Sequence, residues 1–416
     1  MVHSELDRPL SGVKVVEMAN FVAAPACARY LADLGADVIK IESPNPDPLR
    51  GTAVNEGRPA GDYENTSYDL DNANKRDICL NTKTSQGLEV ALKLIGEADI
   101  FITNTREKSL VKMGLDYETL KVKFPKLVYG FITGYGDKGP DKDLPGFDFT
   151  SFFARGGVMG TMMDKDSMPM MPVQGFGDNQ VAMNLASGLI AALYRAARTG
   201  KGDKVTVSLF HSAIWDVSIL LQASQYGAAG IQFPISRKHS TNLFQISQKT
   251  SDGRWFQPAV PPYDARYNDF VTCIGRPDLI GDERFYPQSN AQAHLEELYD
   301  LLAGEFAKHP LAYWVEAFAK ADLPGAACQT WDEVLKDEQA WASDCFYAME
   351  YPVTGATRTL VRTPVMFADT PLPDYNRSPY QGEHTEEILA SLGYTDEQIK
   401  AMMEAGAALH PEPKKG

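Results

Sequence analysis

The chain of 416 residues has little cysteine and no long hydrophobic run. Its five cysteines form no CxxC pair and have no histidine at ligand spacing, which disfavours a structural zinc or iron–sulfur site. No stretch approaches the roughly 18 apolar residues of a membrane span, and the N-terminal region lacks a basic-then-apolar signal pattern. We therefore expect a cytoplasmic protein with no metal and no tightly bound cofactor.

Positive charge is scarce as well. Lys and Arg number 40 against 55 Asp and Glu, which gives a formal net charge of −15. Because nucleic acid binding needs a basic face, this balance argues against a nucleic acid partner. Binding of small anionic ligands stays possible wherever the basic residues cluster locally.

Two common catalytic signatures are missing. The turn Ala19–Pro25 lacks the glycines of a G-x-G-x-x-G fingerprint, which disfavours a nicotinamide enzyme. Glu42 stands near the position at which nicotinamide enzymes carry an acidic residue that binds the ribose. Without the glycine fingerprint, we expect Glu42 to be a surface carboxylate at a strand end. No G-x-S-x-G elbow accompanies the histidines, which disfavours a hydrolase triad.

What the sequence does contain is a regular alternation of strand and helix patterns in its first third. Apolar runs predict strands at 13–17, 37–42, 77–80, 99–103 and 127–133. Helices are expected between them, one of them capped by Thr84. This alternation predicts an α/β fold with a mostly parallel, Rossmann-like sheet, whose ligands bind beyond the carboxyl ends of the strands.

The length of the chain predicts more than one domain. We expect a large α/β domain over 1–215 and 335–416, a smaller α+β domain over 225–325, and linkers between them. Later helices are predicted at 291–308 and 332–341, with Thr385 and Thr395 as caps in a helical tail.

A carboxylate flanked by glycines precedes the longest helical run. The stretch Gly175–Gln180 opens a series of small and apolar residues that closes at Gly200. Asp178 is well placed as an N-cap, since its oxygen could accept from the free N–H groups of the first turn. Alternatively, the same N–H groups and the helix dipole hold Asp178 ionised as a nucleophile facing a substrate carbonyl. The residues alone leave both interpretations open.

Glycine-dense and basic segments accompany this carboxylate. The loops at 134–140 and 155–160 would let backbone N–H groups approach a carbonyl oxygen, although ordinary turns fit equally well. Basic residues at 74–76, 83, 104–108 and 112 are expected at or just beyond strand ends, where phosphates would find donors. Ordinary solvated charge is an equally good interpretation of each.

Motifs that together suggest a family run along nearly the whole chain: Leu10–Glu17, Gly35–Glu42, Asn74–Arg76, Met113–Gly114, Gly134–Gly136, Gly146–Asp148, Gly177–Asp178, Thr199–Gly202 and Gly382–Thr385. In these the chain resembles the family III CoA-transferases, which include formyl-CoA and carnitine CoA-transferases. Asn184, Tyr226 and the segments 261–263 and 337–342 are similar to the branch that transfers CoA to phenyllactate or 2-hydroxyisocaproate in amino-acid fermentation.

The resemblance implies transfer of CoA from an acyl- or enoyl-CoA of the cinnamoyl or isocaprenoyl type to a 2-hydroxy acid. Asp178 would form an aspartyl anhydride and then an aspartyl-CoA thioester, with Gly136 and Gly157 shaping the oxyanion environment. CoA, a substrate here, would contact Val22, Ala23, Leu80, Lys83, Asn104, Arg106 and Lys112. The acid would be bound by Phe147, Asp148 and Tyr226. The long glycine-rich loop of formyl-CoA transferase is absent, which favours acids bulkier than formate or oxalate.

The resemblance also implies an interlocked, ring-shaped homodimer and a loose association with a 2-hydroxyacyl-CoA dehydratase. Two alternative functions are kept. One is an α-methylacyl-CoA racemase, although racemases carry a His where this chain has Phe147, which cannot transfer a proton. The other is a non-catalytic CoA-binding subunit of the dehydratase system, in which Asp178 is only a cap.

Overall fold

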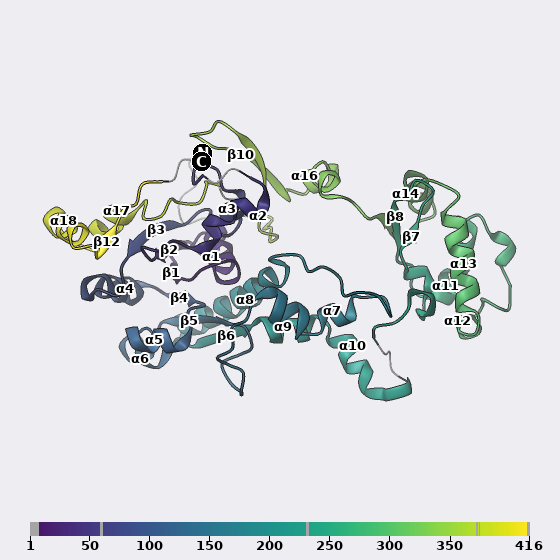
Figure 1. Cartoon of the computed structure of the whole chain (residues 1–416), viewed down its shortest axis with the longest axis horizontal. Helices are drawn as coiled ribbons and strands as arrows, with labels where there is room; N and C mark the ends of the chain where they lie inside the picture. Colours follow the sequence, from purple (N-terminus) through teal and green to yellow (C-terminus); the bar gives the residue numbers. More distant parts are fainter. Residues whose placement is uncertain (1–7, 59–60, 230–232, 372, 374, 414–416) are drawn as a thin grey trace. The chain divides into compact units, whose positions relative to one another are not determined.

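The computed structural model describes residues 8–58, 61–229, 233–371, 373 and 375–413. The chain divides into two compact units (Figure 1). The first comprises Met1–Val158, Pro172–Ile219 and Glu338–Gly416, and the second comprises Met159–Met171 and Leu220–Asp337. The segment Met159–Met171, expected within the large domain, thus belongs to the second unit. Among the helices that the structure describes, none has the length and apolarity to cross a bilayer.

The first unit is built on one sheet with the order β12-β3-β2-β1-β4-β5-β6. Its strands are β1 Lys14–Met18, β2 Asp37–Glu42, β3 Arg76–Leu80, β4 Ile100–Thr103, β5 Val128–Thr133, β6 Lys204–Ser208 and β12 Ala408–Leu409. Neighbouring strands are parallel, except that β12 runs antiparallel to β3. The mostly parallel sheet is therefore confirmed, and its order is that of a doubly wound fold whose winding reverses between β1 and β4.

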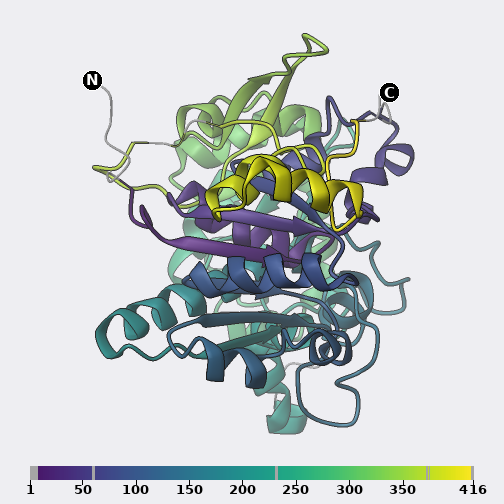
Figure 2. The same cartoon turned by 90° about the vertical axis from the view of Figure 1, so that its left-hand side faces the viewer.

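Helices cover both faces of this sheet. Those of the first unit are α1 Ala23–Asp33, α2 Ala53–Glu56, α3 Thr66–Asn72, α4 Ser85–Glu97, α5 Glu107–Met113, α6 Tyr117–Lys123, α8 Phe176–Thr199, α9 Leu209–Asp216, α16 Glu338–Ala342, α17 Thr385–Ser391 and α18 Asp396–Glu404. Helices α4, α17 and α18 pack on one face, in front of the strands in Figure 2. Helices α1 and α8 pack against each other on the other face (Figure 1). Because both faces are covered, the strands are near-continuous apolar runs.

Side-chain caps fix several helix starts. Thr84 accepts from the backbone N–H of Gly87 at α4, and Thr395 accepts from that of Gln398 at α18, so both predicted caps are confirmed. The prediction for Thr385 is wrong, because the N-cap of α17 is His384. Thr385 is fully buried instead, where its hydroxyl accepts from the backbone N–H of Cys79 in β3.

The second unit is a small α+β assembly. Its strands, β7 Gln248–Lys249, β8 Trp255–Pro258 and β9 Gly325–Ala327, form an antiparallel sheet. Its helices are α11 Tyr263–Cys273, α12 Gln288–Ala291, α13 Leu295–Phe306, α14 Leu311–Lys320 and α15 Trp331–Val334, while α7 Val158–Thr161 and α10 Ser218–Ala223 cross the unit boundary. The predicted helix at 332–341 is in fact two short ones, α15 and α16. The core is rich in aromatic side chains, among them Phe244, Phe256, Phe270, Trp314 and Phe318.

Candidate active site

A pocket of about 480 Å³ opens in the first unit at the carboxyl ends of the sheet strands. It is lined by Asn20–Ala23 after β1, Asn104–Ser109 after β4, and residues of the turn after β5. Asp178, in the first turn of α8, also lines it. The pocket therefore lies at the switch point between β1 and β4, where sheets of this order bind their ligands.

Two asparagines hold the turns on either side of the switch point together. The backbone N–H of Asn20 donates to Oδ1 of Asn104 at 3.2 Å, and Nδ2 of Asn104 donates to the carbonyl of Asn20 at 2.8 Å. The hydroxyl of Thr103 adds a bond of 2.7 Å to the carbonyl of Met18. Asn104, a predicted CoA contact, thus lines the pocket with both ends of its amide already engaged.

The start of α8 is capped from a distance. Its N-cap residue, Gly175, has no side chain to accept a bond, and the carboxylate of Asp148 accepts from the backbone N–H of Gly177 at 3.1 Å. Asp148 begins the π-helical segment η2, Asp148–Ala154. Within the described part of the chain, no hydrogen bond reaches the carboxylate of Asp178. The prediction that Asp178 is the cap is therefore wrong: Asp148 does the capping.

Close packing explains why a glycine precedes Asp178. A Cβ atom added to Gly177 would stand 2.3 Å from Oδ1 of Asp148 and 2.3 Å from Cγ of Phe152. Both distances are far below van der Waals contact. Asp148 is only 5% exposed beneath this turn, so its predicted role in contacting the acid does not fit its position.

Burial is the largest cause of the raised pKa of both carboxyl groups, Asp178 and Asp148. It raises the pKa of Asp178 to about 7 from an ordinary 3.8, with repulsion by Asp148 as the second cause. It raises the pKa of Asp148 to about 6, against the opposing effect of backbone N–H groups that include that of Gly177. The N–H groups of the helix thus stabilise Asp148, and the prediction that they hold Asp178 ionised is wrong. A carboxylate with a pKa near 7 is more basic than an ordinary Asp yet largely ionised at slightly alkaline pH, which suits a nucleophile.

The pocket brings together about half of the predicted site residues: Asp178, Gly136, Val22, Ala23, Asn104, Arg106 and Phe147. The N–H of Gly136 donates to the hydroxyl of Thr133 at 2.8 Å, so it is not free to stabilise an oxyanion. Gly157 lies outside the pocket lining, just before α7.

The remaining predicted residues lie elsewhere. The side chain of Leu80 is fully buried in the core of the sheet, which does not fit contact with adenine. Lys83 and Lys112 are exposed outside the pocket lining, beside α4 and in the last turn of α5. Tyr226 is 78% exposed and belongs to the second unit.

Two cations on the pocket wall are suited to an anionic ligand. Arg106 and Lys142 are exposed there, and neither has an ion-pair partner among the described residues. Lys108, by contrast, pairs with Asp143 at 3.2 Å. The sequence alone does not indicate Lys142, because the loop between β5 and η2 has no periodic pattern that places its side chains.

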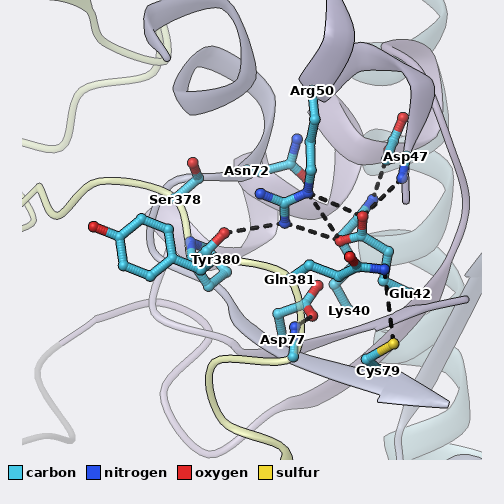
Figure 3. A network of polar contacts seen from close by, with 12 residues as sticks. Lys40, Glu42, Asp47, Arg50, Asn72, Asp77, Cys79, Ser378, Tyr380 and Gln381 are labelled. Atoms are coloured by element: carbon cyan, nitrogen blue, oxygen red, sulfur yellow. Dashed lines mark hydrogen bonds and ion pairs between the residues drawn. The ribbon is translucent and has the colours of Figure 1, made fainter. Parts of the chain in front are cut away.

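Other basic and acidic residues of the predicted ligand site are structural. Lys75 precedes the amino end of β3, whereas the pocket lies at the carboxyl ends of the strands. Its side chain is buried, with Nζ 2.6 Å from Oε2 of Glu17. Arg76 pairs with Asp37 at 2.6 Å. Glu42, expected at the surface, is 2% exposed and takes part in a buried ionic network with Arg50 (Figure 3).

The fold and the pocket define an α/β enzyme that can hold an anionic ligand beside a reactive carboxylate. A model of CoA-transferase family III matches residues 10–385, and the chain belongs to this family. It is 52% identical to cinnamoyl-CoA:phenyllactate CoA-transferase of Clostridium sporogenes, over 94% of this chain and 95% of that protein. It is 42% identical to (R)-2-hydroxy-4-methylpentanoate CoA-transferase of Clostridioides difficile, over 94% and 97%.

Solved structures agree with this assignment. A CAIB/BAIF family protein from Brucella suis matches with a TM-score of 0.80 at 30% identity, over 93% of this chain and 100% of that chain. The resemblance found in the sequence is therefore confirmed. The protein is a CoA-transferase and uses CoA thioesters as substrates.

Proposed function

We propose that the protein moves CoA from an enoyl-CoA of the cinnamoyl or isocaprenoyl type to a 2-hydroxy acid of the phenyllactate or 2-hydroxyisocaproate type, with Asp178 as the nucleophile. The observation that carries the proposal is the Asp178 carboxylate, which lines the pocket and has no hydrogen-bond partner in the described part of the chain. Two relatives of high coverage are named for acids of these two kinds, one aromatic and one branched.

The chemistry needs no redox step and no net proton. A carboxylate oxygen of Asp178 attacks the thioester carbon, the C–S bond breaks, and CoA leaves as the thiolate. The thiolate then attacks the carbonyl carbon of Asp178 in the mixed anhydride, which releases the donor acid and leaves aspartyl-CoA. The acceptor carboxylate repeats the two steps in reverse and leaves with CoA. Arg106 and Lys142 would pair with the phosphates of CoA at the pocket rim.

The two alternatives have less support. A racemase needs a second proton-transfer group beside the Asp, and none of the described residues that line the pocket is a histidine. A binding subunit would need Asp178 for a structural purpose, but α8 is capped by Asp148. The contribution of Gly157 to an oxyanion site and the association with a dehydratase stay predictions.

A homodimer is the proposed assembly. Phe176, Met183 and Tyr194 lie seven and eleven residues apart on α8, hence on one face of it, and are 48%, 40% and 66% exposed. Trp215, on α9, is 71% exposed. Large exposed apolar side chains of this kind mark interaction surfaces. Light scattering after size-exclusion chromatography should give twice the mass of the chain, and a monomer would contradict the proposal.

The purified protein alone tests the proposed function. Incubated with cinnamoyl-CoA and phenyllactate, it should form phenyllactyl-CoA, followed by liquid chromatography. Asp178→Asn should abolish the transfer and retain CoA binding. The control is Asp37→Asn, which removes an exposed carboxylate paired with Arg76 at the amino ends of the strands, away from the pocket. This variant should transfer CoA normally. Transfer that needs a dehydratase, or exchange of an α-proton without transfer, would contradict the proposal.

A further inference from the structure

Phe21 has an unusual backbone conformation at the mouth of the pocket. Its φ of +64° lies in the left-handed region, which bulky side chains rarely adopt. Its side chain lines the pocket and is 41% exposed. Such a conformation costs free energy and persists only where the surroundings fix it, and it is often found at functional sites.

Asp47 is the residue that fixes Phe21. Oδ1 of Asp47 accepts from the backbone N–H of Phe21 at 3.0 Å and from that of Leu49 at 3.0 Å. Its other oxygen accepts from Nζ of Lys40 at 3.1 Å. Lys40 in turn donates to the carbonyl of Ala19 at 3.0 Å, so the turn after β1 is anchored at two points.

Asp47 itself cannot move easily, because it belongs to the buried ionic network of Figure 3. Its backbone N–H donates to Glu42 at 2.7 Å, and Glu42 pairs with Arg50 through both of its oxygens. The guanidinium of Arg50 stacks over the ring of Tyr68 at 4.0 Å. Separating one member from its partners would leave a buried charge unpaired, which is strongly destabilising, so the network holds Asp47 in place.

The network presents the ring of Phe21 to a second aromatic ring. The rings of Phe21 and Phe147 meet edge to face, with centroids 5.6 Å apart and planes at 89°. Phe147 also lines the pocket and is 56% exposed. Its backbone is fixed by a bond of 3.1 Å from its N–H to the hydroxyl of Thr150. Two apolar rings on anchored backbone segments thus stand exposed in the pocket that contains Asp178.

We propose that Phe21 and Phe147 form an aromatic wall that selects the side chain of the acid, favouring aryl over small side chains. The proposal rests on the proposed function and adds Phe21 as a specificity-determining residue. An aryl group placed against two edge-to-face rings gains both apolar burial and a favourable ring geometry. The methyl side chain of lactate gains little of either.

Competition between two acceptors tests the wall. The protein receives cinnamoyl-CoA with phenyllactate and lactate together, and the ratio of phenyllactyl-CoA to lactyl-CoA is measured by mass spectrometry. Both acceptors draw on the same aspartyl-CoA, so the ratio does not depend on the donor step. Phe21→Gly should lower this ratio by roughly tenfold, and Phe147→Ala should do the same.

Phe21→Gly suits the test because glycine adopts a positive φ without strain, so the turn is expected to keep its shape. Phe149→Ala is the control: Phe149 packs on Phe153 with centroids 6.4 Å apart, outside the pocket lining, and its loss should leave the ratio unchanged. If the Phe21→Gly variant is active and its ratio of phenyllactyl-CoA to lactyl-CoA is unchanged, the wall is refuted. An equal fall in the formation of both products leaves the ratio unchanged and is the same result. A wild-type protein inactive with both acids refutes the proposed function, and the wall with it.

Discussion

The pH dependence of Asp178 should depend on the neighbouring Asp148. The pKa of Asp178 is raised to about 7 from 3.8, first by burial and second by Asp148. Because Asp148 is the smaller of the two causes, it accounts for less than half of the difference, at most about 1.5 pH units or roughly 2 kcal/mol. Asp148→Asn removes this charge while an amide oxygen can still accept from the N–H of Gly177, so α8 keeps its cap.

The assay is kcat/KM for the CoA donor between pH 5 and 9, which reports groups of the free enzyme. The wild-type acid limb should have its midpoint near pH 7, since only ionised Asp178 attacks the thioester. In Asp148→Asn the midpoint should fall by about one pH unit. Asp37→Asn, far from the pocket, should leave it in place. A midpoint that stays or rises in Asp148→Asn, in a protein with unchanged circular dichroism, would refute the electrostatic argument.

Three stability predictions follow from buried contacts, each checked by denaturant unfolding. Gly177→Ala should lower the free energy of unfolding by about 1–3 kcal/mol, because its Cβ would stand 2.3 Å from Asp148. Gly304→Ala in α13, where nothing lies within 4 Å of the added Cβ, should raise the free energy of unfolding by about 0.5–1 kcal/mol. Glu17→Gln should cost about 3–5 kcal/mol, since it leaves two buried lysines without their shared carboxylate; a loss below 1 kcal/mol would contradict this. Asp178→Asn should be more stable than the wild type above pH 7, because the raised folded-state pKa means that the ionised carboxylate destabilises the folded protein. The difference in the free energy of unfolding should shrink towards pH 4, and a difference that grows on acidification would contradict the prediction.

The strands that sequence patterns predict are those buried on both faces. Strand β4, Ile100–Thr103, is fully buried and appears as an uninterrupted apolar run. The sequence pattern does not predict strand β6, Lys204–Ser208, because this strand lies at the end of the sheet order beside β5, is largely half-buried and carries polar side chains. Strand β12, Ala408–Leu409, is too short to give a periodic signal. Burial on both faces therefore decides which strands the sequence reveals.

The candidate site was predictable in its nucleophile but not in its supporting contacts. Asp178 stands out because glycines and a long helical run surround it. Its neighbour Asp148 caps the same helix from 29 residues away, and no local spacing indicates such a contact. Lys75 was expected near a ligand on charge alone, but its charge is satisfied by Glu17, which is 58 residues distant along the chain. Long-range pairing of this kind is visible only once the fold is known.

Trapping the covalent intermediate tests the central claim most directly. The protein is incubated with cinnamoyl-CoA, quenched with hydroxylamine, digested and analysed by peptide mass spectrometry, beside the Asp178→Asn variant. Hydroxylamine attacks the acyl carbon of an aspartyl-CoA thioester, releases CoA and leaves a stable hydroxamate on the aspartate. The account predicts a hydroxamate on Asp178 in the wild type and none in the variant. An unmodified Asp178 in a protein that transfers CoA, or a hydroxamate on another carboxylate, would contradict it.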